Sequence, residues 1–392
     1  MKKKVYFVPI LWVLLLGFAT HLYAFGKRTE VKLPENISSG LKHLLQIVEP
    51  GRKTTFDPRV ASDILAFMER KKNTNALYHA EDVDGPPSAY HEFDVQRNLE
   101  YILRYNFNPD IPCAVMVPSS TRRAYWEKVE GYGHKLPYLS DYLNDLYAPV
   151  IIKGVEFIEN TPDIFSGAYY SYHLYRTLIL FKYQGRNVLI SISKQTDVSN
   201  VGKKGYVLGS DENWDYLYSG ETGTNITGLG WVRSYMYDSY GVTIYYELDN
   251  QAPRVRCGTF RWIRAGWSQI NFVKKSHIYH GLIRFAESFK EIMEYPDMPD
   301  ADELAKTFLR MMSLPVEVLQ KKTEIYLNLL KDRYDTVDSP SKNHPSKLFS
   351  NSGQWSNMSK DEMVATLGVE YIKYVMGKTQ NKKIKELFYF VD

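Results

Sequence analysis

The clearest hydrophobic pattern in this chain of 392 residues is a pair of alternating runs separated by a short polar connection. Residues 169–183 and 188–193 are rich in β-branched and aromatic side chains, and Gly185 lies in the connection between them. In the second run every other residue is Val or Ile, which is the period of a strand with one buried face. Together these features predict a β-hairpin.

Other short apolar runs extend this pattern. Residues 231–237 and 242–248 flank the turn-like segment 238–241 and predict a second hairpin. Residues 254–264 add a strand, and 113–118 match a short buried strand that precedes the first hairpin. Successive strands joined by turns predict an antiparallel sheet.

One segment has an uninterrupted helical period. Over residues 271–295 the apolar positions are spaced by 4, 3, 4 and 3 residues, which places them on one face of an α-helix. These positions are Ile278, Leu282, Phe285, Phe289 and Ile292. Charged residues occupy the other face, and Pro296 ends the segment. We expect a long amphipathic helix directly after the sheet.

Shorter helical patterns lie on both sides of this sheet and helix. Asp57 followed by a proline predicts a helix start, and apolar spacing predicts another helix over 91–105. Ser359 and Glu362 have capping-box spacing. Later helices are expected over 301–312, 316–334 and 360–377. The predicted fold class is α+β, with an antiparallel sheet packed on a long helix and with N- and C-terminal helical additions.

The pattern divides the chain into four segments. These are a signal peptide (1–24), an N-terminal helical region (25–110), an antiparallel α+β domain (111–295) and a C-terminal helical region (296–392).

The first segment has the three-part layout of a secretory signal peptide. Three lysines at 2–4 precede the apolar run 5–19, and Ala24 marks the expected cleavage point. An uncleaved anchor is the alternative, but about fifteen apolar residues are fewer than the roughly 20 that a spanning helix needs. We therefore expect a soluble periplasmic or secreted protein with no transmembrane segment after signal cleavage.

Charge narrows the range of partners. The net charge of +4 includes the three leader lysines and falls to +1 when they are removed. A nearly neutral chain lacks the basic surface that binds phosphate backbones, so no nucleic-acid partner is expected.

Cysteine usage is low, with only Cys113 and Cys257. In an oxidising compartment the two are able to form a disulfide, and the alternative is a pair of buried free thiols. Two cysteines are too few for a Cys-rich zinc site, and no C-x-x-C-H haem motif is present. We expect no cofactor.

Each candidate catalytic or metal-binding motif lacks a residue, or a spacing between residues, that its chemistry requires. The acidic segment 79–85 does not match a calcium loop, and no second histidine follows His91 one turn later. The glycine-rich segment 220–230 lacks the Gly-Lys-Ser/Thr ending of a phosphate loop, and no Gly-x-Ser-x-Gly elbow occurs. No catalytic residue and no metal site are assigned. Enzymatic activity is left open, with a non-enzymatic role favoured.

Aromatic content is the unusual feature of the composition, with 31 Tyr, 18 Phe and 7 Trp. Tyrosine and tryptophan combine a large apolar surface with a polar tip, which suits pocket walls as well as packed sheets. Candidate ligand-binding side chains are Tyr170, Tyr172, Tyr235, Tyr237, Tyr245, Trp262 and Trp267. The alternative is that these rings belong to a solid core.

In outline, residues 111–295 resemble the START-like helix-grip domains. The resemblance rests on the hairpin at 169–193, the later strands over 231–264 and the closing helix at 271–295. It implies a curved sheet that wraps the helix around an apolar cavity for lipids, sterols or other hydrophobic ligands. It covers about half of the chain and transfers no signature residue, and the long loop 194–213 departs from it.

Three hypotheses follow. The leading one is an exported soluble protein that binds a hydrophobic or amphipathic, lipid-like small molecule. The second is an envelope structural or protein-interaction factor with an envelope protein as its partner. The third is a hydrolase that acts on an envelope polymer. The state of the space between sheet and helix distinguishes the first from the others, because a solid core there leaves no room for a ligand.

Overall fold

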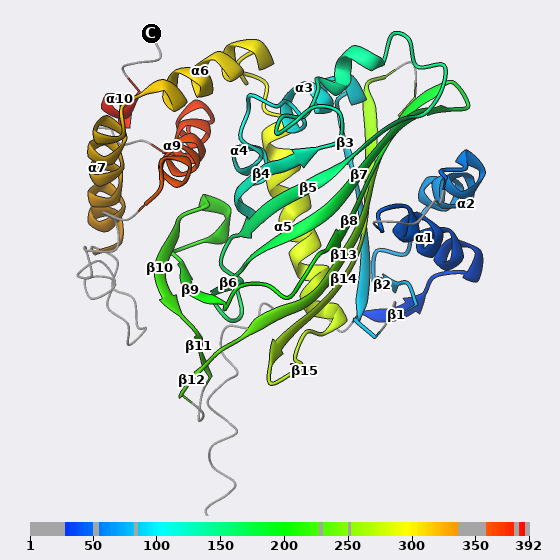
Figure 1. Cartoon of the computed structure of the whole chain (residues 1–392), viewed down its shortest axis with the longest axis horizontal. Coiled ribbons are helices and arrows are strands. Elements are labelled where there is room, and N and C mark those ends of the chain that lie inside the picture. Colours follow the sequence, from blue (N-terminus) through cyan, green and yellow to red (C-terminus); the bar gives the residue numbers. More distant parts are fainter. Residues whose placement is uncertain are drawn as a thin grey trace, which may run out of the picture.

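The computed structural model describes residues 28–49, 55–81, 85–226, 230–249, 252–335, 358–379 and 384–388. The predicted signal peptide, residues 1–24, lies outside the described residues. The fold is α+β and is built on a large mixed sheet of ten strands (Figure 1). In the part of the chain that is described, no helix combines the length and apolarity needed to cross a membrane.

The large sheet brings together strands from distant parts of the sequence. Among the described strands of this sheet, β1 and β2 pair in parallel and the other pairings are antiparallel. The order across the sheet is β1 (Thr29–Lys32), β2 (Ala76–His79), β3 (Ser88–Val95), β14 (Arg254–Trp267), β13 (Tyr235–Asp249), β8 (Arg186–Gln195), β7 (Ser171–Tyr183), β5 (Val150–Asn160) and β4 (Thr121–Val129), with β15 (Ile270–Asn271) paired to β14.

The first predicted hairpin is confirmed as β7 and β8. Tyr183 pairs with Arg186, so the connection is the two residues Gln184 and Gly185. Their φ angles are 50° and 78°, and two successive positive φ angles are what a type I′ turn requires. Glycine adopts this conformation without a steric penalty, which explains why the turn falls here.

The second predicted hairpin is wrong. Residues 238–241 lie inside the single long strand β13. Tyr240 and Gly241 pair on one side with β14 and on the other with β8, so the strand gains a ladder on both edges. The turn-like residues produce only a register shift between Met236 and Asp238. Pairing with two neighbours outweighs the local turn preference.

Helices cover both faces of the sheet (Figure 1). Helices α1 (Glu35–Ile47) and α2 (Pro58–Glu69) pack on one face, where their apolar side chains join those of the central strands. Asp57 caps α2 by accepting a hydrogen bond from the Arg59 amide at 2.9 Å, as its position before Pro58 predicts. Helix α5 (Lys275–Met293) lies on the opposite face and contacts β3 and β14.

The N-terminal region is only partly helical. It supplies β1, β2 and β3 to the sheet, and the predicted helix over 91–105 is the end of β3 followed by α3 (Leu99–Asn106). The prediction missed β3 because residues 91–95 form the last part of a strand that pairs with β14, a contact distant in sequence. The predicted strand at 113–118 is the short helix α4 (Cys113–Met116), preceded by Pro112.

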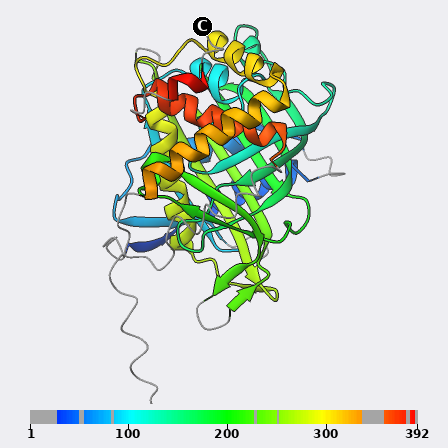
Figure 2. The same ribbon diagram turned by 90° about the vertical axis from the view of Figure 1, so that its left-hand side faces the viewer.

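Helices α6 (Ala301–Ser313), α7 (Val316–Asp335), α9 (Lys360–Val375) and α10 (Ile384–Leu387) follow α5. The predicted capping box is present, because the Ser359 amide donates to Glu362 Oε2 at 2.7 Å and the Glu362 amide donates to Ser359 Oγ at 3.3 Å. Figure 2 shows α7 and α9 in front of the strands and α5, and α9 contacts α4 and β4. Phe308 and Ile372 belong to the same buried cluster as residues of α3 and the sheet.

Smaller elements complete the fold. A three-stranded sheet has the order β10 (Tyr216–Thr222), β9 (Lys203–Val207) and β6 (Ala168–Tyr169), and β11 (Thr224–Ile226) pairs with β12 (Gly230–Val232). Two short 3-10 turns lie at Leu139–Tyr142 and Asp211–Asn213.

Candidate ligand-binding site

A cavity of about 730 Å³ lies between the large sheet and α5. Its walls come from β5, β7, β13, β14 and α5, together with the segments around α4 and residues 160–170. Three of its aromatic wall residues, Tyr125, Phe165 and Phe272, are 41 %, 56 % and 49 % exposed, so the cavity opens to solvent. Concave sites of roughly 300–1,000 Å³ hold drug-sized ligands.

Strand alternation decides which side chains face this space. On β14, Arg261, Ile263 and Ala265 line the cavity, whereas Phe260 and Trp262 belong to the core under α1 and α2. Strand β7 contributes Tyr172, Leu174 and Arg176 at the same period, and β13 contributes Thr243 and Tyr245. Opposite them, α5 presents residues spaced by three and four positions: Ile278, Gly281, Leu282 and Phe285.

Four of the seven aromatic residues proposed from the sequence line the cavity. They are Tyr170, Tyr172, Tyr245 and Trp267. The Tyr170 hydroxyl donates to Ser234 Oγ at 3.1 Å. Trp267 Nε1 is buried and has no hydrogen-bond partner among the residues that the structure describes.

The remaining three do not line the cavity. Trp262 is completely buried on the opposite face of the sheet, where its Nε1 donates to the Glu81 carbonyl at 3.0 Å. Tyr237 accepts a hydrogen bond from the Gln269 amide at 2.9 Å and stacks with Tyr235 at a ring-centroid distance of 6.4 Å. The sequence proposed these rings as ligand-binding residues on the basis of aromatic composition. Composition does not show which face of the sheet a side chain occupies, because that depends on the strand register.

Two charged side chains of the cavity wall form an internal ion pair. Arg176 Nε donates to Glu156 Oε2, and Arg176 Nη1 donates to Ser191 Oγ at 2.8 Å. Burial acts to lower the pKa of Arg176, but the Glu156 carboxylate outweighs it and holds that pKa above its ordinary value. Burial likewise acts to lower the pKa of Arg284, but Tyr216 and the Asp211 carboxylate hold that pKa above its ordinary value. Arg284 donates hydrogen bonds of 2.6 and 2.7 Å to Asp211.

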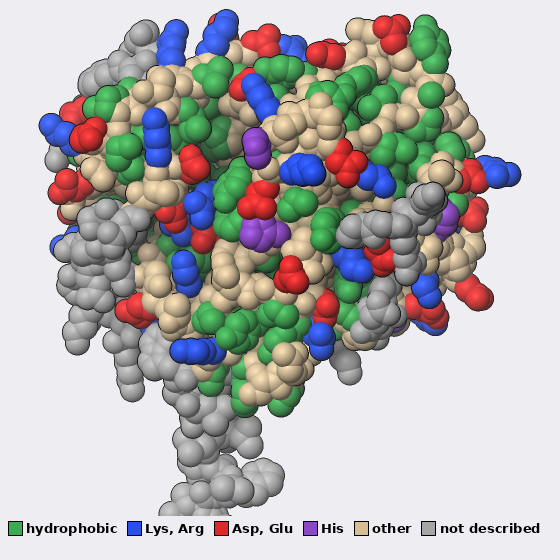
Figure 3. All heavy atoms as spheres, viewed as in Figure 1, with side chains coloured by type: hydrophobic (Ala, Val, Ile, Leu, Met, Phe, Trp, Pro, Cys, Tyr) green, Lys and Arg blue, Asp and Glu red, His purple; other side chains and the backbone are tan. Residues whose placement is uncertain are grey.

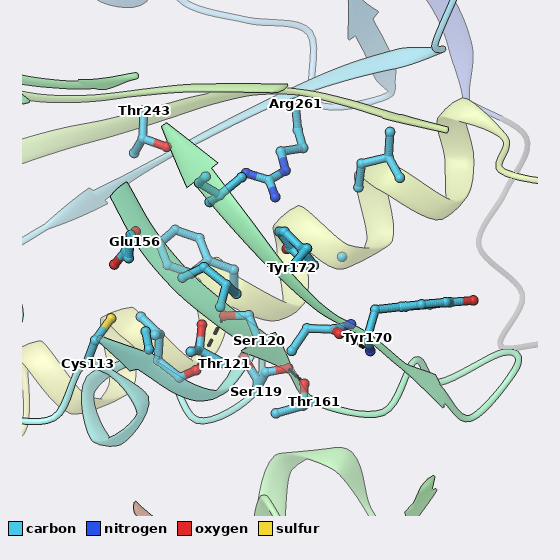
Figure 4. A pocket seen from close by; sticks show the side chains of 18 of the residues that line it. Cys113, Ser119, Ser120, Thr121, Glu156, Thr161, Tyr170, Tyr172, Thr243 and Arg261 are labelled. Carbon is cyan, nitrogen blue, oxygen red and sulfur yellow. Dashed lines mark hydrogen bonds between the residues drawn. The ribbon is translucent and has the colours of Figure 1, made fainter. Parts of the chain in front are cut away.

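Arg261 is different, because no carboxylate in the described part of the chain forms an ion pair with it. Its side chain points into the cavity, toward Tyr172 (Figure 4). Burial lowers the pKa of Arg261 from its ordinary value, while the interaction with Tyr172 acts in the opposite direction. Sequence analysis missed Arg261, Arg176 and Glu156. What the sequence did offer was the presence of charged residues within otherwise apolar strands.

The cavity's hydroxyl groups are mostly engaged by the protein itself. Ser119 Oγ lies 2.6 Å from Ser288 Oγ and donates to the Arg284 carbonyl at 3.0 Å. Thr161 Oγ1 donates to the Ser119 carbonyl at 2.6 Å, and Ser120 Oγ donates to the Val117 carbonyl at 3.3 Å (Figure 4). None of these hydrogen bonds joins a hydroxyl to a histidine or carboxylate base, which nucleophilic catalysis by serine needs.

Both cysteines are free thiols in the structure, so the disulfide left open by the sequence is not formed. Cys113 lines the cavity, and burial raises the pKa of its thiol to about 12. Burial also raises the pKa of the Cys257 thiol. Such thiols are protonated at neutral pH and are poor nucleophiles. Among the described residues, no group of three or more His, Cys, Asp or Glu side chains is arranged to hold a metal ion.

Comparison of the chain with protein-family models, curated proteins and solved structures gives no match. The resemblance to START-like helix-grip domains therefore stays a prediction from the sequence pattern. The assignment of function depends on the cavity and its side chains.

Proposed function

We propose that this protein is a non-enzymatic binder of an amphipathic, lipid-like small molecule, which it holds between the large sheet and α5. The observation that carries the proposal is the open cavity of about 730 Å³ at that place. A packed core there would have left no volume for a ligand. The sequence pattern over 1–24 adds the proposal that the protein works in the periplasm or after secretion.

The character of the walls supports an amphipathic ligand. Apolar side chains such as Ile158, Leu174 and Leu282 alternate with Tyr172 and the charged groups of the sheet. Apolar walls with a few placed polar groups are the usual composition of small-molecule sites. On the face shown in Figure 3, basic and acidic side chains intermingle and neither sign forms a continuous field, which favours a small ligand over a polyanion.

Gly281 offers a direct test of occupancy. It lies on the cavity side of α5, and a Cβ added there meets no heavy atom within 4 Å. Gly281 is exposed at the open side of the cavity, so Gly281→Phe is expected to obstruct that opening without displacing the core. We expect it to weaken binding of the uncharged apolar probe N-phenyl-1-naphthylamine at least tenfold in a fluorescence titration.

Gly281→Ala is the matched control. It leaves the cavity nearly unchanged and should stabilise the helix by about 0.5–1 kcal/mol, because alanine loses less backbone entropy than glycine. Native mass spectrometry of protein purified from its own compartment should also show a co-purifying ligand that is lost in Gly281→Phe. Failure of the probe to bind the unmodified protein, or equal binding by both variants, would contradict the proposal.

A further inference from the structure

We propose that Arg261 binds the acidic head group of the ligand, so that the ligand is an amphiphile with one negative charge, of the long-chain carboxylic acid class. This inference rests on the proposed function, because it concerns the same cavity. It adds the chemistry of the ligand's polar end and the orientation in which the ligand enters.

The first step is the contrast between Arg261 and the other cations of the cavity wall. Arg176 pairs with Glu156, Arg284 pairs with Asp211, and Lys135 pairs with Asp110 at 2.8 Å. Each of these positive charges is therefore paired with a carboxylate of the protein itself. Arg261 has no such carboxylate among the described residues, although its side chain is partly buried in the cavity wall.

The second step is the cost of this arrangement. Removing a charged group from water without a counter-charge costs several kcal/mol, so buried charges are normally paired. Strand β14 also carries Arg256 and Arg264, and each of these forms an ion pair, with Asp94 and Asp238 respectively. A negatively charged ligand would give Arg261 the ion pair that Arg256 and Arg264 form with protein carboxylates.

The third step is the space that the sheet leaves around the guanidinium. Across the strands Arg261 is in register with Gly241, and Gly241 is in register with Ser193. A Cβ on Gly241 would lie only 2.8 Å from Arg261 Nη1 and 3.0 Å from Ser193 Oγ. Glycine at this position thus allows the guanidinium to lie over the sheet, with Tyr172 beside it (Figure 4).

The fourth step is the choice of anion. A guanidinium presents parallel N–H donors that match the two oxygens of a carboxylate. The charged group that acts on Arg261 is Arg176, and its charge is already balanced by Glu156. Arg261 therefore leaves one positive charge for the ligand, which suits a single negative charge better than a dianion such as a phosphate monoester. The walls beyond Arg261 are apolar, with Ile263, Met236 and Leu282, and they suit a hydrocarbon tail.

The experiment compares an acid with its uncharged analogue. Hexadecanoic acid and hexadecanol are each used to displace N-phenyl-1-naphthylamine from the full-length protein near pH 8. We expect the acid to displace the probe at a concentration at least tenfold lower than the alcohol. Arg261→Gln should remove this preference by weakening the acid at least tenfold while leaving the alcohol unchanged.

Arg264→Gln is the matched control, because Arg264 lies on the same strand but outside the cavity, paired with Asp238. It should retain the preference for the acid. If Arg261→Gln does not fold, as judged by thermal unfolding, Gly241→Ala serves instead, since its methyl group displaces the guanidinium from its position over the sheet. That variant should also lose the preference for the acid.

The outcomes separate the two proposals. Absence of naphthylamine binding to the unmodified protein contradicts the binding function itself. Probe binding with equal displacement by acid and alcohol, or a preference that persists in Arg261→Gln, overturns only the assignment of Arg261. A preference that is lost equally in Arg264→Gln would show a general effect of surface charge and would also overturn the assignment.

Discussion

At the scale of single residues, the side chains that define this site are charged groups at inward-facing strand positions. Arg261 and Arg176 both face the cavity, but only Arg176 has a protein carboxylate beside it. Sequence inspection favoured tyrosine and tryptophan as site residues because aromatic rings are common in pocket walls. It could not separate Tyr172 from Trp262, because their faces depend on the strand register.

His91 provides a prediction about pH at this scale. Its imidazole packs edge-on against Tyr279 at a centroid distance of 5.5 Å, and burial, followed by the charge of Arg28, lowers its pKa from 6.5 to about 4. The folded state therefore binds this proton less readily than the unfolded state. The resulting stability is complete above pH 6.5 and is lost as the pH falls toward 4.

Between pH 7.5 and 5 this group should remove about 2 kcal/mol from the free energy of unfolding, measured with urea. His91→Phe keeps the ring packing and cannot bind a proton, so the variant should lose that part of the pH dependence. Identical pH dependence in the variant and the unmodified protein would show that His91 does not contribute.

At the scale of secondary-structure elements, the sequence was informative where the contacts are local. The hairpin of β7 and β8, the helix α5 and the capping box of α9 were each predicted from neighbouring residues. Two of the errors occur where distant pairing decides the outcome. Strand β3 was taken for the start of a helix, and β13 was divided by a turn, because their partners in the sheet are far away in the sequence.

The turn of the β7–β8 hairpin should be sensitive to loss of its glycine. Gly185 has a φ of 78°, a left-handed conformation in which a Cβ costs roughly 1–2 kcal/mol. Gly185→Ala is therefore expected to lower the free energy of unfolding by about that amount in urea titrations. A Cβ there meets no heavy atom within 4 Å, so the loss would arise from the backbone alone. Gly185→Asn, which tolerates this conformation better, should lose less. Equal stability of all three proteins would contradict this account of the turn.

At the scale of the whole molecule, the cavity is the feature that no local pattern specified. Its lining comes from β5, β7, β13, β14, α5 and the region around α4, which are separated by more than a hundred residues of sequence. The hydrophobic pattern predicted a sheet and a helix, whereas the gap between them was expected only from the resemblance to helix-grip domains. That gap depends on the side-chain volumes of all these elements together.

The C-terminal helices are joined to the rest of the fold by a buried charge cluster, and this cluster supports a prediction. Asp215, before β10, is fully buried and accepts hydrogen bonds from Lys373 Nζ at 2.5 Å, Arg333 Nη1 at 2.7 Å and the Tyr334 hydroxyl at 2.8 Å. Lys373 also pairs with the buried Glu370 at 2.8 Å. The cluster thus connects α7 and α9 to the segment between the small sheet strands.

Asp215→Asn removes the negative charge and leaves the Lys373 and Arg333 charges under-compensated in a buried place. Breaking a buried ion pair in this way costs about 3–5 kcal/mol, whereas an exposed pair contributes little.

The matched control is Asp302→Asn, which breaks the exposed pair of Asp302 with Arg104 at 3.1 Å and should cost less than about 1 kcal/mol. Because the cluster lies at the contact of α7 and α9 with the small sheet, hydrogen exchange in Asp215→Asn should rise first in these helices and later in β7, β8 and β13. Uniform acceleration over the whole chain would instead show that the C-terminal helices unfold together with the large sheet as one unit.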